Sequence, residues 1–145
     1  MSTTQSTQGL SITTTDHPNA TRMREAFAAF ARGDLDAVRD SMAPDVVWTT
    51  AGSSRLAGTY RGWDEVLGMF GRYVEITGGT ATIDLVSVVA DDRHAVAIYD
   101  QTSTVDGRTE THRQVMVDEV TGEAKPSAVR LMAYDQAAAD RHFGA

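Results

Sequence analysis

The chain has 145 residues, of which 41% are hydrophobic and 23% charged, as is typical of one globular domain with its own core. The formal net charge of −7 argues against a nucleic-acid partner, because phosphates would repel it. The chain has no cysteine, which excludes disulfides and thiolate sites and suits a cytoplasmic protein, and no apolar stretch is long enough to span a membrane.

The N-terminal segment is composed mostly of Ser, Thr and Gln, which cannot build a core. It has neither the basic nor the apolar region of a secretory signal. We therefore expect a disordered tail over residues 1–15 and a single domain over residues 16–145.

Helical periodicity is the first regular pattern along the chain. Apolar residues recur at helical spacing over 18–32, where Pro18 suits the first turn and Gly33 suits the end of a helix. Asp34 suits the N-cap of a short second helix that ends before Pro44. We then expect a strand over 45–50, a glycine-rich loop, and a third helix over about 64–76.

The second half of the chain is dominated by strands. Four are expected over about 80–90, 94–104, 109–120 and 127–135, and a last helix over 136–143. Short turn sequences such as Asp106-Gly107 separate them. Because helices come first and consecutive hairpins last, the sequence predicts an α+β fold with an antiparallel sheet rather than alternating βαβ units.

Three local stretches carry a resemblance to a known family. They are "FARGDLDAVRDSMAPDVVWTTAG", "YRGWDEVLGMF" and "VRLMAYDQ". Together with the order of elements over residues 18–143, they make the chain resemble the SnoaL-like branch of the nuclear transport factor 2-like superfamily. This family includes polyketide cyclases, ketosteroid isomerases, epoxide hydrolases and domains that only bind, so the fold alone does not settle the function.

The resemblance implies a particular geometry. A cone-shaped, curved antiparallel sheet would pack against the N-terminal helices, as in a cystatin-like roll. Its concave face would line a pocket for a small, largely apolar molecule of the polyketide or steroid kind. Its convex face would pair two chains as a homodimer.

Side chains of the long strands alternate between two sets. The aliphatic set is Val96, Ile98, Val115, Val117, Val129, Leu131 and Ala133. The mixed set is Ala97, Tyr99, Gln101, His112, Gln114, Met116, Arg130, Met132 and Tyr134. Burial alone would place the aliphatic set against the helices. The resemblance places the mixed set in the cavity, and we favour this arrangement because a monomer rarely exposes so many β-branched residues.

Three residues of the mixed set are candidates for catalysis. His112 could act as a general base near neutral pH, or be a histidine satisfied by its neighbouring strands. Arg130 could hold an oxygen of a ligand, or pair with Glu119 or Asp118. Tyr99 could donate a hydrogen bond to a carbonyl.

The remaining candidates are expected to bind the ligand as parts of the pocket wall. They are Trp48, Thr50, Trp63, Tyr73, Gln101, Gln114, Met116, Met132 and Tyr134. Either tryptophan could instead be a packing residue. The histidines lack metal-ligand spacing and no glycine-rich phosphate loop is present, so we expect neither a metal nor a cofactor.

The family's proton carriers are missing at the positions where the resemblance would place them. The cyclases' aspartate and histidine fall on Met132 and Met116, and Asp135 is expected to cap the last helix. Two functions therefore stay open. One is an acid–base enzyme of the isomerase, cyclase or hydrolase type, and the other is a non-catalytic ligand-binding or association domain.

Overall fold

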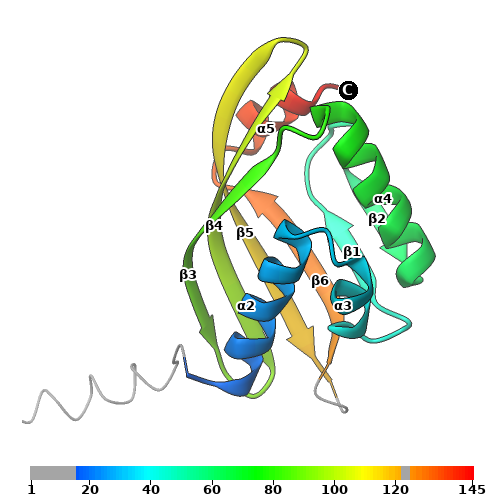
Figure 1. Cartoon of the computed structure of the whole chain (residues 1–145), viewed down its shortest axis with the longest axis vertical. Coiled ribbons are helices and arrows are strands. Elements are labelled where there is room, and N and C mark those ends of the chain that lie inside the picture. Colours follow the sequence, from blue (N-terminus) through cyan, green and yellow to red (C-terminus); the bar gives the residue numbers. More distant parts are fainter. Residues whose placement is uncertain (1–15, 122–124) are drawn as a thin grey trace, which may run out of the picture.

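The computed structural model describes residues 16–121 and 125–145, so the tail expected over 1–15 lies outside the described residues. Helices and strands follow one another as α2 (Pro18–Ala31), α3 (Leu35–Asp40), β1 (Val47–Thr50), β2 (Gly58–Arg61), α4 (Gly62–Thr77), β3 (Thr82–Ala90), β4 (His94–Val105), β5 (Arg108–Val120), β6 (Pro126–Ala133) and α5 (Gln136–Phe143). The α+β class is confirmed, with helices first and long strands last (Figure 1).

Within the described residues, six strands form one curved, unclosed sheet in the order β2-β1-β6-β5-β4-β3. Every pair is antiparallel except β1 with β6, which is parallel. The parallel junction brings the N-terminal half of the chain against its last strand. Strand β2 falls where a glycine-rich loop was expected, and it forms because β1 offers a free edge on which Tyr60 lies opposite Trp48.

Side-chain caps set the beginnings of three helices. His17 accepts a hydrogen bond from the backbone of Asn19 at the start of α2, directly before Pro18. Asp34 and Asp135 do the same for α3 and α5, as expected from the sequence. Helix α4 ends at Thr77 and is capped by Gly78, whose φ of 59° is the left-handed conformation that favours glycine.

Helices cover the concave face of the sheet. Figure 1 shows α2 and α3 lying across it, α4 beside β1 and β2, and α5 near the turn of the β4–β5 hairpin. Apolar side chains of α2, α3 and α4 pack on β1 and β6 around Trp48, Phe70 and Val129. A second group joins α2 to β3 and β4, and a third packs Phe143 of α5 on Val105.

The mixed set of side chains faces the helices on β4 and β5, as expected, but not on β6. Tyr99, Gln101, His112 and Gln114 are buried there. On β6 it is instead Val129, Leu131 and Ala133 that face inward, so the expected cavity orientation of Arg130 and Tyr134 is wrong, whereas Met132 still contributes to the pocket wall from a position that is 37% exposed. The pairing of β5 with β6 is irregular at Glu119 and Val120, and a one-residue step exchanges the two faces of a strand.

Candidate functional site

An apolar pocket lies between the helices and the concave face of the sheet. Its volume is about 140 Å³, and its wall combines residues of α2, α3, α4 and α5 with residues of the sheet. Most of the wall is aliphatic, aromatic or thioether in character. A pocket with mainly apolar walls and a few polar groups is the usual form of a small-molecule site.

Strand β1 contributes Trp48 and Thr50 to this wall, as expected from the sequence. The Trp48 indole Nε1 donates to Thr50 Oγ1 over 3.0 Å, and the Thr50 hydroxyl lies 3.4 Å from the Met69 sulfur. The hydroxyl satisfies the buried indole, which leaves the Trp48 ring as a flat apolar surface. Gln114 and Met116 of β5 also line the pocket.

Two acids among the described residues line the pocket, Asp118 and Asp140, and Asp118 is the buried one. It follows Met116 by two positions on β5, so its side chain lies on the same face, and only 9% of the residue is exposed. Its Oδ1 atom is buried without a hydrogen-bond partner among the described residues. Burial raises the pKa of Asp118 to about 7, although the charge of Arg22 lowers it. The carboxyl group can therefore give or take a proton near neutral pH.

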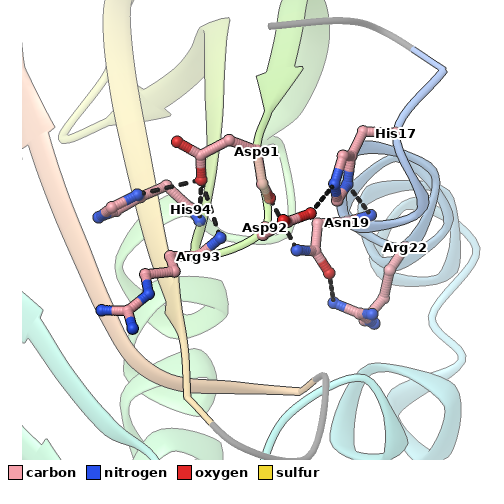
Figure 2. Close-up of polar contacts among 7 residues, drawn as sticks. All are labelled: His17, Asn19, Arg22, Asp91, Asp92, Arg93 and His94. Atoms are coloured by element: carbon pink, nitrogen blue, oxygen red, sulfur yellow. Dashed lines mark hydrogen bonds and ion pairs between the residues drawn. The ribbon is translucent and has the colours of Figure 1, made fainter.

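Arg22, the cation near this acid, is held by the turn between β3 and β4. The Asn19 amide donates to the Asp91 carbonyl over 2.9 Å, and its oxygen accepts from Arg22 Nη1 over 2.8 Å (Figure 2). His17 of the same helix end lies 2.9 Å from Asp92 in the turn. The hairpin turn thus fixes the distance at which the guanidinium acts on Asp118.

Two tyrosines of the wall stay neutral. Burial raises the pKa of Tyr73 to about 12. Burial and the neighbouring Tyr73 raise the pKa of Tyr99 well above its usual value. Phe27 packs edge-on against Tyr99 with ring centroids 5.1 Å apart. Neutral phenols in such a wall can donate hydrogen bonds to a ligand oxygen.

Three of the expected binding residues do not line the pocket. Trp63 packs against Phe70 with ring centroids 6.0 Å apart, and Gln101 is buried beyond the wall, with neither amide atom within hydrogen-bond geometry of a described partner. Tyr134 is 63% exposed. Met132 does line the pocket, as expected, although it is 37% exposed.

Two of the three expected catalytic residues lie outside the pocket wall. Arg130 is exposed and pairs with Glu119 at 3.3 Å, the pairing weighed against a ligand role. His112 faces inward but lies 2.9 Å from Glu110, with its ring beside that of His142. Burial lowers the pKa of His142. Only Tyr99 of the three lines the pocket.

Sequence reasoning missed Asp118 as a site residue. The alternation that identified His112, Gln114 and Met116 continues to Asp118 on the same strand, so the signal was present. It also missed the meeting of Glu110 with His112 and His142, because the last histidine comes from another element and spacing along the chain does not reveal the contact.

A family model described as the SnoaL-like domain matches residues 23–126. The chain belongs to the SnoaL-like family. This confirms the resemblance carried by the three sequence stretches. Within the part of this SnoaL-like domain that the structure describes, no helix has the length and apolar character needed to cross a membrane.

Several proteins are similar to this SnoaL-like domain. An uncharacterised protein of Mycobacterium tuberculosis (strain ATCC 25618 / H37Rv), Rv0034, is 34% identical over 109 residues, which cover 74% of this chain and 83% of that protein. Bal32a, from a soil-derived mobile gene cassette, superposes with a TM-score of 0.81 at 29% identity, covering 87% and 96% of the two chains. A nuclear transport factor 2-like protein of unknown function from Burkholderia pseudomallei K96243 gives 0.77 at 27% identity, covering 88% and 98%.

Proposed function

We propose that this SnoaL-like domain binds a small, largely apolar molecule in the pocket and transfers a proton on it, with Asp118 as the general base. The observation that carries the proposal is a buried carboxyl group, raised in pKa to about 7, in an apolar wall. A carboxyl group whose pKa lies near the working pH is the form that acid–base enzymes use. Asp118 takes the role that the sequence had suggested for His112.

The pocket size restricts the substrate. A dry apolar cavity of about 150 Å³ holds one benzene ring, and the pocket here has a volume of about 140 Å³. We therefore expect a single ring, or one ring of a larger polyketide-like molecule, to be enclosed. The net charge of −7 and the apolar wall both favour a neutral compound over an anion.

The proposed reaction is an isomerisation next to a carbonyl. Ionised Asp118 takes a proton from the carbon that lies between the carbonyl and a C=C double bond, and the electron pair of the broken C–H bond forms a new C=C bond and displaces the carbonyl electrons onto oxygen, which gives a dienolate. The neutral hydroxyl of Tyr99 or Tyr73 donates to that oxygen as its charge grows. Protonated Asp118 returns the proton to the far carbon of the original double bond, which re-forms the carbonyl and leaves the double bond conjugated with it, so no oxidant or co-reactant is needed.

The test uses cyclohex-3-enone, a one-ring substrate that becomes conjugated cyclohex-2-enone when a proton moves along the ring. Turnover is followed by the ultraviolet absorbance of the product, and exchange of ring protons with deuterated water is followed by NMR. We expect Asp118→Asn to lower both rates by about 100-fold or more. Glu119→Gln, the neighbouring and half-exposed acid, is the matched control and keeps both rates.

The competing function is binding without chemistry. An apolar pocket of this kind suits it equally well, and neither Arg130 nor His112 lines the wall. If wild type and Asp118→Asn bind the ketone alike and neither exchanges ring protons faster than buffer, the domain is a binder and the proton-transfer proposal is wrong.

We also infer that two copies associate through the outer face of the sheet. The aliphatic residues Val96, Ile98, Val115 and Val117 lie opposite one another on β4 and β5, and Met132 extends the row on β6. A contiguous apolar face of this kind on a small protein is typical of an interaction surface.

A further inference from the structure

Glu110, His112 and His142 form a cluster of potential metal ligands outside the pocket. His112 Nε2 lies 2.9 Å from Glu110 Oε1, and His142 Nδ1 lies 3.4 Å from the same oxygen. One ligand atom from each residue lies within 4.8 Å of the others. The first two residues come from β5 and the third from α5, so folding brings them together.

One ring nitrogen of this cluster, Nδ1 of His142, is buried without a hydrogen-bond partner among the described residues. His142 is 1% exposed, and its Nδ1 makes no hydrogen bond within the described part of the chain, because the 3.4 Å approach to Glu110 lacks hydrogen-bond geometry. Its other ring nitrogen, Nε2, lies 3.0 Å from Ser103 Oγ. If Nε2 donates to that hydroxyl, Nδ1 carries a bare lone pair directed at the cluster. A buried acceptor left in this way is costly unless something occupies it.

Glu110 connects the cluster to solvent. Its side chain is 41% exposed, whereas the histidine side chains are 8% and 0% exposed. Arg108 approaches the other carboxylate oxygen, Oε2, at 3.9 Å, which leaves Oε1 for the two imidazoles. An ion can therefore enter past Glu110.

The same residues offer a second interpretation as a Ser103–His142–Glu110 catalytic triad. Ser103 is 1% exposed and does not line the pocket, so no substrate can reach its hydroxyl. A nucleophile must lie within contact distance of the substrate. The hydroxyl is better placed as the outer partner that orients a metal-binding imidazole.

We propose that Glu110, His112 and His142 form a three-ligand site for a divalent transition metal ion of the Zn²⁺ class. Two imidazole nitrogens and one carboxylate oxygen are ligands that Zn²⁺ takes, with a water molecule in the fourth position. Ligand atoms 2.9 and 3.4 Å apart are near the separation that four-coordinate Zn²⁺ requires, given bonds of about 2.0–2.2 Å. This site is independent of the proton transfer proposed for Asp118.

The ion would tie the last helix to the sheet. Phe143, which follows His142, lines the pocket and packs against both imidazole rings, with ring centroids 6.4 Å from His112 and 5.1 Å from His142. Fixing His142 therefore fixes one part of the pocket wall. The role of the metal is to hold α5 in place, without contact with the ligand in the pocket.

The test measures binding of Zn²⁺ by calorimetry to untagged full-length protein, with Co²⁺ as a spectroscopic probe. We expect one ion per chain, visible absorbance from Co²⁺ of low coordination number, and no binding of Mg²⁺. Excess Zn²⁺ should raise Tm by about 5 °C or more. Glu110→Gln and His112→Gln should bind Zn²⁺ more than about 100-fold more weakly, and Ser103→Ala about 10–100-fold more weakly.

Matched controls use the two other histidines of the chain. His17→Gln and His94→Gln alter imidazoles that are 21% and 50% exposed and lie beside Asp92 and Asp91, and both variants should bind Zn²⁺ as wild type does. His142→Gln tests the third ligand, but this residue is buried and the variant could fail to fold. Glu110→Gln then still tests the site, because Glu110 is half exposed. The proposal is overturned if wild type binds no Zn²⁺, if Glu110→Gln binds it unchanged, or if the control variants lose it.

Discussion

Asp118 combines a titratable group with surroundings that oppose its charge. Its carboxyl group lies in an apolar wall, and the charge of Arg22 acts on it from a position fixed by Asn19. The folded protein therefore holds a proton on Asp118 at pH values where the unfolded chain has lost it. The same burial that makes the residue a proton carrier destabilises the fold once the group ionises.

This predicts how stability depends on pH. The pKa of Asp118 is about 7 when folded and 3.8 as the ordinary value, so the folded state binds the extra proton between about pH 4 and 7. The free energy of unfolding should fall as pH rises through this window, by up to about 4 kcal/mol from this residue. Urea unfolding from pH 4 to 8 measures it. Asp118→Asn should remove this part of the slope, and an unchanged slope would contradict the assignment.

A second prediction concerns Arg22. Its charge lowers the pKa of Asp118, so Arg22→Gln should raise that pKa further above 7. The Asp118 carboxyl carbon, followed by NMR through a pH titration, reports the change directly. Arg32→Gln alters an exposed arginine at the end of the same helix, paired with Asp34, and should leave the titration unchanged.

The loop between β1 and β2 holds the C-terminal helix α5 through several hydrogen bonds. Asp140 accepts hydrogen bonds from the backbone and hydroxyl of Ser53, and Arg55 donates to the Phe143 carbonyl over 2.9 Å. Gly52 lies under this contact with a φ of 96°, and a Cβ atom there would meet the side chains of Asp140 and Gln136. The close approach of loop and helix therefore depends on glycine.

Gly52→Ala should accordingly destabilise the protein more than an ordinary loop substitution. The change adds a clash with Asp140 to the strain of a positive φ, and we expect a loss of about 2–4 kcal/mol. Gly33→Ala is the matched control, since Gly33 has a φ of 75° but open space around its Cβ position. Equal losses in urea unfolding would show that the clash with α5 has no effect.

Elements with local signals could be predicted from the sequence, and contacts between distant elements could not. Pro18, Asp34 and Asp135 mark helix starts by their own chemistry, and alternation identified the inward faces of β4 and β5. The face of β6 was predicted wrongly because the irregular pairing next to Glu119 is not encoded by a periodic pattern. The histidine cluster needed the position of α5, which only the folded chain supplies.

At the scale of the whole molecule, the sheet has one covered face and one uncovered face. Helices close the concave side over the pocket, and the aliphatic row of β4 and β5 lies on the other side. The correction on β6 makes that row narrower than the sequence predicted, because Val129, Leu131 and Ala133 belong to the inside. The remaining row is still contiguous across two long strands.

The inferred association can be tested on this row. Ile98→Lys places a charge in its middle, so a dimer held by this face should separate into single chains. Light scattering coupled to size exclusion measures the mass. Leu67→Lys, which changes an apolar residue 38% exposed on α4, should leave the mass at twice that of one chain. A wild-type protein with the mass of a single chain would contradict the inferred association.

The strand order has a consequence for how the protein is made. Strand β6 lies between β1 and β5, yet it follows every other strand in the sequence. When β1 through β5 have left the ribosome, the nascent chain can form only two separate pieces of sheet, β2-β1 and β5-β4-β3. Each piece has an open edge where β6 will pair. The sheet becomes continuous only after β6 has left the ribosome, so the barrier to folding includes the closure of a loop that spans most of the domain. Until then, both edges are exposed to other chains, and this is the stage at which we expect a chaperone to be needed.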